Sequence, residues 1–568
     1  METPDQPLGL KRADVCYLTV LLVSALLFFI PNLGRVHLFD WDEINFAESA
    51  REMIVTGDYA RVRINFQPFW EKPPFFLWLQ CLCMNVFGIG EFAARLPNAI
   101  FGVLTLLTLY WIGKRSVGRR FGFIWGVCYL GSFLPHMYFK SGIIDPVFNY
   151  FIFLGIYVAY RAIQDDAKSP AQLALLSGAL IGLANLTKGP VGLLIFMLTM
   201  TAYWLALRCK RIVSLWTMLA FALSFTLVSF LWFGMEVLQH GPWFVIEFIK
   251  YQIELFATPV AGHKQPIYYH FVVVFIGCFP MSILALPCLL NRSRDGDDAL
   301  MGLMRLLFWV VMILFTIVST KILHYSSMSY LPLSYLASVY IHRLVTAREE
   351  LARYVFRLLA LTGVSICVIL VAAPLAVYRS DLLIPYLRHE FLVACLQSQV
   401  TWQGYEFLVG PLYLLALVTA LILLMRRHIT QGLLALLYST ATCMALFLLT
   451  MMPIIDAYYQ APAINFYKSM AGRDVYVLPV GFKSYAHYFY FQKPRRTEHG
   501  DQEERYLLTG NIDKPAYFVT KANNRDFPKA NPGCRLLKRE GGYLFYSRMP
   551  TRELVSRGER SSATRSGP

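Results

Sequence analysis

The run from Val15 to Ile30 reads VCYLTVLLVSALLFFI and contains no charged residue. It follows Lys11 and Arg12, so a cationic segment precedes an apolar one. A helix of about 20 such residues crosses the hydrocarbon core of a bilayer. No cleavable signal peptide is evident, and the run is typical of a signal-anchor helix.

The composition of the whole chain agrees with this first run. Of its 568 residues, 57% are hydrophobic and 15% are charged, and the mean hydropathy is +0.48. Soluble domains carry about a quarter charged residues, so a soluble globular enzyme, a disordered chain and a fibrous protein are excluded. The net charge of +16 is attributed to cytoplasmic loops, which collect Lys and Arg. The sequence therefore predicts an all-α polytopic membrane protein.

Apolar runs recur along the chain and predict about thirteen membrane spans. A further run, Pro73–Phe87, would reverse the side of every later loop if it crossed, so we expect an interfacial or re-entrant helix there. The basic loops then lie on the side of Lys11 and Arg12, which predicts a cytoplasmic N-terminus and an outer C-terminus. The expected spans are residues 15–32, 96–113, 121–138, 145–160, 172–187, 190–207, 213–234, 268–290, 303–319, 326–342, 354–378, 408–425 and 431–452.

The long polar segments fall on the outer side, beginning with a first outer loop at about 33–95. After residue 452, short runs rich in β-branched and aromatic residues alternate with turn-prone clusters. We predict a transmembrane domain over 1–452, a small extracytoplasmic α/β domain over 453–550 and a disordered tail over 551–568. The expected strands are Val475–Val480, Tyr485–Phe491, Ala516–Thr520 and Gly542–Tyr546.

Charged residues occur where spans are expected to leave the membrane on the outer side. Ionisable groups at such positions are rare and usually face a cavity. Their restriction to one face favours an enzyme whose active site opens outward at the level of the lipid head groups. A transporter would place its charges near the midplane, in two matching halves, and no matching halves are found. The six clusters are Asp42-Glu43, Glu71-Lys72, Lys140 to Asp145, Lys188, His263 and Lys321 to Tyr325.

Five of the six clusters also have a purely structural explanation. The pair Asp42-Glu43 suits the N-terminus of a helix, and Asp145 precedes a proline as a helix cap does. Lys188 can snorkel from the end of a span, and the Glu71-Lys72 pair can anchor an interfacial segment. A lone outer-face histidine such as His263 is more often solvated than bound to a metal.

Taken in order, the motifs resemble the GT-C glycosyltransferases that use lipid-linked sugars. The bacterial aminoarabinose transferase and protein mannosyltransferase superfamily matches best. The resemblance covers about residues 10–345 and is specific for the superfamily but not for the sugar, and beyond it only the layout is shared. The motifs are Asp42-Glu43, Ala50-Arg51-Glu52-Met53, Gly57-Asp58, Trp70-Glu71-Lys72-Pro73-Pro74, Phe92-Ala93-Ala94-Arg95-Leu96-Pro97, Asp145, Leu186-Thr187-Lys188-Gly189-Pro190 and Lys321 to Tyr325 before Pro332.

The resemblance implies two groups of site residues. One is catalytic: Asp42 as the principal carboxylate, Glu43 beside it, and Asp145 as a second acidic residue. The other binds the phosphate of the lipid-linked donor, as listed here: Lys72, Lys188 and Tyr325.

The resemblance also implies a cofactor and shows one departure. Glu71 and His263 match positions that look like metal ligands in the aminoarabinose branch, so a divalent metal such as zinc is implied. No nucleotide cofactor is expected, because the donor sugar is carried by a lipid. The family often has an arginine three residues after the first Asp, where this chain has Asn45. Lys140 is the candidate replacement for that cation near the donor phosphate.

The function implied is that of an integral-membrane glycosyltransferase in a bacterial inner membrane. It would move a sugar from polyprenyl phosphate to a periplasmic acceptor, specifically 4-amino-4-deoxy-L-arabinose to lipid A, with no nucleic-acid partner. Transfer of mannose or another hexose to a protein or surface glycan is the alternative among enzymes. A lipid or sugar-lipid flippase is the non-enzymatic alternative, and six charged outer-face clusters argue against a structural protein.

Overall fold

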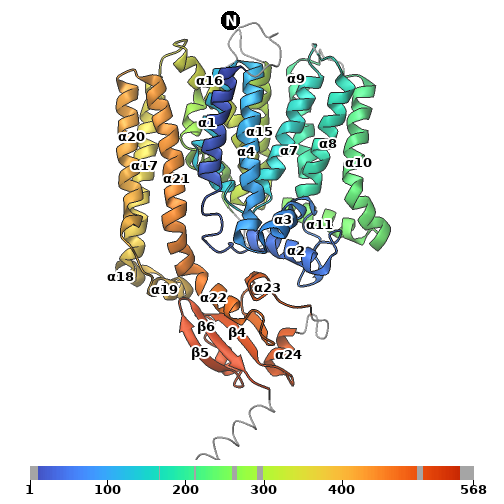
Figure 1. Cartoon of the computed structure of the whole chain (residues 1–568), viewed down its shortest axis with the longest axis vertical. Coiled ribbons are helices and arrows are strands. Elements are labelled where there is room, and N and C mark those ends of the chain that lie inside the picture. The colour runs from blue at the N-terminus through green and yellow to red at the C-terminus, as the bar shows by residue number, and fades with distance from the viewer. Residues whose placement is uncertain are drawn as a thin grey trace, which may run out of the picture.

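A helical bundle makes up most of the molecule (Figure 1). The computed structural model describes residues 11–165, 167–209, 213–258, 265–290, 299–495 and 503–550. Within these ranges, eight helical segments are long and apolar enough to cross a bilayer. They are α1 (Arg12–Phe29), α4 (Glu91–Ser116), α8 (Pro170–Lys188), α10 (Leu215–His240), α15 (Ala299–Ile317), α17 (Arg353–Tyr378), η4 with α20 (Tyr405–Leu408 and Val409–Met425) and α21 (Ile429–Tyr459).

The remaining expected spans fall on shorter or interrupted helices. Pro280 lies at one interruption, because proline has no backbone N–H to continue the helical hydrogen bonds. The mostly helical architecture is confirmed, and the count of thirteen spans stays a prediction. These elements are α7 (Asp145–Ala162), α9 (Val191–Ala206), η2 with α16 (Leu323–Ser329 and Tyr330–Val345), α5 with α6 (Arg119–Leu130 and Phe133–Tyr138), and α12, α13 and α14 (Tyr269–Gly277, Met281–Leu284 and Leu286–Leu290).

The first outer loop folds into short elements at one end of the bundle. Helix α2 (Asp42–Thr56) begins with two acidic residues, which stabilise a helix N-terminus, and is followed by strands β1 (Arg63–Ile64) and β2 (Gln67–Pro68). Helix α3 (Phe75–Phe87) comes next, and α11 (Trp243–Ala257) joins it from a later loop. Figure 1 shows α2, α3 and α11 together at the lower end of the bundle, against the lower ends of the long helices. This placement fits the interfacial helix expected at 73–87.

Close packing of α7 against α8 fixes two of the segments that carry site residues. The hydroxyl of Ser177 donates to the carbonyl of Gly155 over 2.8 Å. On its other side, α8 packs closely against α10. A Cβ at Gly178 of α8 would overlap the carbonyl oxygen of Phe221 on α10, so a small residue is required for the backbones of α8 and α10 to approach. The first residue of α7 and the last residue of α8 are thereby held beside each other.

A four-stranded sheet forms the lower end of the molecule (Figure 1). Its strand order is β3-β4-β6-β5; β3 is parallel to β4, and the other pairs are antiparallel. Leu478 lies opposite Phe518, and Phe518 lies opposite Tyr546. The elements of this part are α22 (Ala461–Met470), β3 (Tyr476–Val480), α23 (Ala486–Phe491), α24 (Glu503–Thr509), β4 (Ala516–Lys521), α25 (Phe527–Ala530), β5 (Arg535–Glu540) and β6 (Tyr543–Arg548).

Three short elements of the segment before α20 lie near the sheet. Figure 1 shows α18 (Ser380–Leu383) and α19 (Glu390–Leu396) at the lower end of the long helices, with η3 (Ile384–Tyr386) between them in the chain. The ring of Phe391 packs against Tyr543 of the sheet with centroids 5.3 Å apart. The lower end of the bundle in Figure 1 and the sheet are therefore in direct contact.

One predicted strand is wrong and one strand was not predicted. Residues 486–491 form helix α23 rather than a strand, because Ala486, Phe489 and Tyr490 are all buried at helical spacing. The preference of aromatic residues for strands reflects packing more than backbone conformation. Strand β5 has the sequence RLLKRE, and all six of its residues are exposed. This sequence lacks the alternation of apolar and polar residues that marks a half-buried strand, so the strand was not predicted.

Candidate active site

Two of the predicted site residues form a buried ion pair where α7 begins and α8 ends. The Nζ atom of Lys188 lies 2.6 Å from Oδ1 of Asp145. The side chains are 13% and 4% exposed. Asp145 stands in the first turn of α7 and Lys188 in the last turn of α8, where the helix dipoles favour these charges. Residues separated by 43 positions therefore meet.

A histidine joins this pair to the first outer loop. The Nε2 atom of His324, on η2, lies 3.7 Å from Oδ2 of Asp42 and 3.7 Å from Oδ2 of Asp145. Burial lowers the pKa of His324, although Asp145 opposes that effect, so the imidazole is mostly neutral at pH 7. His324 was noted in the sequence only as part of a cluster, and the structure makes it the link between both acids.

The two acidic residues differ in accessibility. The side chain of Asp42 is 42% exposed, whereas that of Asp145 is 4% exposed. Asp145 is engaged by Lys188, and the described contacts of Asp42 involve only His324. Asp42 is thus the carboxylate that an incoming molecule can reach.

A second lysine and two tyrosines complete this end of the bundle. Lys72 Nζ lies 5.5 Å from the ring centroid of Tyr251 on α11, and Lys188 Nζ lies 5.0 Å from that of Tyr325. Burial lowers the pKa of Lys72, and Glu71 and Asp42 partly offset this effect. Two cations, Lys72 and Lys188, therefore lie in the electrostatic range of Asp42 and can bind an anion such as a phosphate.

Glu43 has a structural environment rather than a catalytic one. Both of its oxygens accept from the Arg95 guanidinium, over 3.0 and 2.7 Å, and also from the backbone N–H groups of Phe39 and Gly142. Burial raises the pKa of Glu43, but Arg95 and the two backbone donors outweigh it, so the pKa lies below its usual value. These contacts make Glu43 an anchor of the loop that carries Asp42, and its expected catalytic role stays a prediction.

Lys140 also differs from expectation. Its Nζ atom donates to the backbone carbonyls of Phe28 and Pro31, over 3.1 and 2.6 Å, at the end of α1. Burial, together with the nearby Arg95, lowers the pKa of Lys140 to about 8. The ammonium group is engaged at the end of α1, and its expected role in replacing the cation missing at Asn45 stays a prediction.

The metal expected at Glu71 and His263 stays a prediction. His263 lies outside the described residues, and Glu71 is next to Tyr251, whose pKa is raised by burial and by this carboxylate. In the part of the chain that the structure describes, no three His, Cys, Asp or Glu residues are grouped to hold a metal ion. Glu71 alone does not make a metal centre.

Parts of the chain are similar in sequence to known proteins. The family model described as dolichyl-phosphate-mannose-protein mannosyltransferase matches residues 71–233. A protein of Edwardsiella ictaluri, named undecaprenyl phosphate-alpha-4-amino-4-deoxy-L-arabinose arabinosyl transferase, is 29% identical over 366 residues. A protein of the same name from Yersinia enterocolitica is 26% identical over 325 residues. These matches cover 63% and 56% of this chain, and only 65% and 58% of the two relatives.

The fold likeness is broader than the sequence likeness. The aminoarabinose transferase ArnT from Cupriavidus metallidurans superposes with a TM-score of 0.76 in its apo state and 0.75 bound to undecaprenyl phosphate, at 19% and 18% identity. Each match covers 94% of this chain and 98% of the other. The chain is similar in part of its sequence to these aminoarabinose transferases and to the mannosyltransferase family model, and similar in fold to ArnT. Coverage of 94% must include most of residues 453–550, so the likeness of fold to ArnT extends beyond the bundle into the sheet.

Proposed function

We propose that this protein is an integral-membrane glycosyltransferase that moves a sugar from a polyprenyl-phosphate donor to an acceptor outside the membrane. The observation that carries the proposal is the gathering of Lys72, Lys188 and Asp145 around the accessible carboxylate of Asp42 at one end of the bundle. This combination binds an anionic group while leaving one acidic side chain open to a second reactant.

The arrangement supports a simple transfer step. The bond between the anomeric carbon and the phosphate oxygen breaks, and a new bond forms from an acceptor oxygen to that carbon. The leaving group is a phosphate monoester, whose developing charge Lys72 and Lys188 stabilise. A hydroxyl acceptor would give its proton to Asp42; a phosphate acceptor is already anionic, and Asp42 would then orient it.

The specific proposal is transfer of 4-amino-4-deoxy-L-arabinose to lipid A. The names of the two curated relatives and the fold of ArnT support this choice. Transfer of a hexose such as mannose to a protein or glycan is the alternative favoured by the matched family model. A flippase is the non-enzymatic alternative.

We further propose thirteen spans in a bacterial inner membrane, with the site and the α/β domain outside. Asp14 at the start of α1 pairs with Lys114 and Arg119, each over 3.0 Å. The basic turn between α4 and α5 therefore lies at the N-terminal end, opposite α2 and the sheet (Figure 1). Cytoplasmic loops carry an excess of such residues, which supports this orientation.

Mass spectrometry of lipids tests the function. Cells with and without the protein are compared for polyprenyl-phosphate sugars and for lipid A, and the purified protein is assayed in detergent with the same donors. We expect loss of the protein to raise a donor sugar and remove the same sugar from its acceptor. Transfer in detergent separates an enzyme from a flippase, since no membrane needs to be crossed there. Absence of any transfer in detergent would contradict the proposal.

His324 should position the two acids during transfer. Replacing His324 with alanine removes the group that faces Asp42 and Asp145, and we expect kcat to fall by about 10²-fold, in the range of an acid–base contribution. The His324→Gln protein keeps an N–H donor and should retain more activity. The check is kcat and its pH profile; equal kcat and pH profiles for wild type and His324→Ala would contradict this role.

A further inference from the structure

The contacts of His324 with the two acids do not fix its position by themselves. Its Nε2 atom lies 3.7 Å from Oδ2 of Asp42 and of Asp145, and a hydrogen bond requires a shorter distance. The residue belongs to η2, a 3-10 helix of seven residues, and the hydrogen-bond geometry of such helices is poorer than that of α-helices. A stable arrangement therefore needs a further contact between η2 and α7.

A buried hydrogen bond provides such a contact. The Nδ2 group of Asn149 on α7 donates to Oγ of Ser327 on η2 over 2.8 Å, and the two residues are 178 positions apart in the chain. Both side chains are buried. A buried side-chain hydrogen bond between distant segments fixes their relative position, because breaking it leaves a polar group without a partner away from water.

The spacing along both helices places this bond one turn away from His324 and Asp145. Asn149 follows Asp145 by four residues on α7, and residues four apart lie on the same face of an α-helix. Ser327 follows His324 by three residues on η2, and side chains three apart are eclipsed in a 3-10 helix. The pair Asp145–His324 and the pair Asn149–Ser327 are therefore successive contacts along one junction between α7 and η2.

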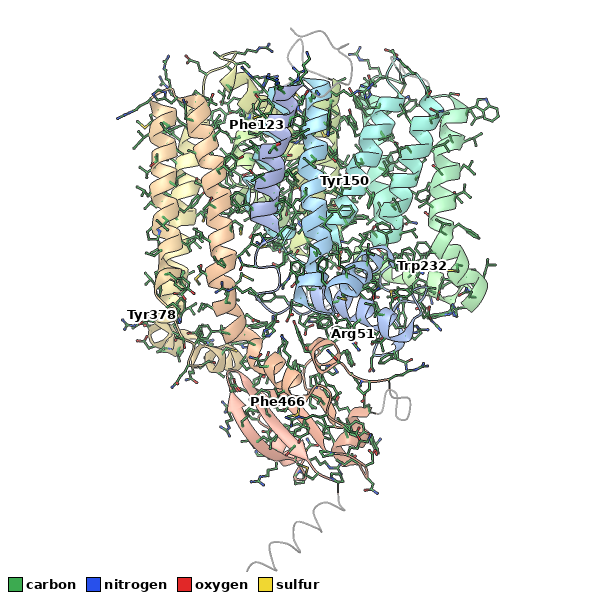
Figure 2. All side chains as sticks on the ribbon, viewed as in Figure 1. Arg51, Phe123, Tyr150, Trp232, Tyr378 and Phe466 are labelled. Carbon is green, nitrogen blue, oxygen red and sulfur yellow. The ribbon has the colours of Figure 1, made fainter. Side chains whose placement is uncertain are left out.

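A cavity beside the bond increases its importance for the attachment of η2. Asn149 and Ser327 line this cavity together with Tyr138 and Tyr330. Tyr150, labelled in Figure 2, is the next residue of α7 and lines the same cavity. Side chains at a cavity lack packing partners on that side. Packing therefore contributes less to the junction at this point, and the hydrogen bond contributes more.

We propose that Asn149 and Ser327 are positioning residues, which hold His324 between Asp42 and Asp145 during sugar transfer. They act through η2 and not through contact with the reacting groups. Without their bond, η2 can move relative to α7, and a misplacement of about 1 Å at a catalytic group can lower a rate by about 10²-fold. This inference rests on the proposed function and adds to it two residues that support the site from inside the bundle.

A double-mutant cycle on the purified full-length protein tests the proposal. Ser327→Ala removes the acceptor oxygen, and we expect kcat to fall about tenfold, within the range that small misplacements produce. In a His324→Ala background, the same substitution should change kcat less than about twofold, because the effects of residues that act through one group do not add. Ser327→Thr keeps the hydroxyl and should retain most of the activity, and Asn149→Ala should reproduce the loss in Ser327→Ala.

Ser334→Ala is the matched control. Ser334 on α16 accepts from Nε1 of Trp125 on α5 over 2.8 Å and is buried, so this variant loses a similar hydrogen bond at a position ten residues beyond His324. Its kcat should match that of the wild type.

Hydrogen exchange measured by mass spectrometry gives a second readout that needs no activity. Backbone amides of the peptide that covers η2 should exchange faster in Ser327→Ala than in the wild type, because local opening becomes easier. Exchange in this peptide should be unchanged in Ser334→Ala.

Three results would overturn the proposal. They are a kcat of Ser327→Ala equal to that of the wild type or of Ser334→Ala, an equal fold loss of kcat from Ser327→Ala with and without His324, and unchanged exchange of η2 in Ser327→Ala. Absence of transfer by the wild type would instead contradict the proposed function, and hydrogen exchange would then still decide whether the bond holds η2.

Discussion

The Asp42→Asn protein should transfer sugar about 10²- to 10⁴-fold more slowly than the wild type, the usual contribution of a positioned acid–base group. The substitution keeps the size of the side chain but removes the charge and the proton-accepting oxygen. Because the side chain is 42% exposed and its only described partner is His324, the fold should be unchanged. The rate of transfer from polyprenyl-phosphate sugar, measured with purified protein, checks this prediction.

The Asp381→Asn protein provides the control for a lost carboxylate. Asp381 is exposed on α18, where it pairs with Arg379 over 3.1 Å, and exposed ion pairs contribute little. Its transfer rate should match that of the wild type. If Asp42→Asn folds and transfers within tenfold of the wild type, Asp42 is not the proton acceptor, and an anionic acceptor oxygen that needs no base becomes the better explanation.

The position of the site could be predicted from the sequence because charge near a membrane is costly. Asp145 and Lys188 stand at the ends of apolar runs, where charge is disfavoured, so both were expected to face a site, but their contact with each other was not predicted. Their actual contact is 2.6 Å long. The same reasoning applies to Asp42 and Lys72, which lie next to expected membrane boundaries.

The choice between neighbouring carboxylates could not be predicted. Asp42 and Glu43 are adjacent, and consecutive side chains of a helix point about 100° apart. One turns toward His324, and the other turns toward Arg95, which lies 52 positions further along the chain. Nothing local in the sequence indicates which side faces the site.

Contacts with residues far away in the sequence also determine the role of His324 and the helical conformation of α23. The histidine stands in the run KILHY, and its role depends on two acids that reach it from α2 and α7. Helix α23 is stabilised by its packing against the first outer loop, where the ring of Tyr490 lies edge to face on His37 with centroids 5.5 Å apart. Tertiary contacts of this kind override the local preference of an aromatic run.

Arg95→Met should be the most destabilising of the substitutions considered. Arg95 bonds both oxygens of Glu43, and it also donates to the carbonyls of Leu33, Val36 and His37 over 2.7 to 2.8 Å. Removing one partner of a buried pair leaves the other charge without compensation, at a cost of about 3–5 kcal/mol. The free energy of unfolding in detergent should fall by this amount, and transfer should fall too, because Glu43 fixes the start of α2.

Two control variants, Arg379→Met and Arg95→Lys, test whether the loss of stability in Arg95→Met comes from the buried pair with Glu43. Arg379→Met removes an exposed partner of Asp381, and its free energy of unfolding should stay close to that of the wild type, because exposed ion pairs contribute little. Arg95→Lys keeps the charge but loses the planar group that contacts Glu43 and three carbonyls together, so its stability should lie between those of wild type and Arg95→Met. If Arg95→Met is no less stable than Arg379→Met, the buried pair does not hold the loop, and the position of Asp42 must depend on the contacts of Asp40 and Leu38 with Tyr485 and Tyr490 of the C-terminal part.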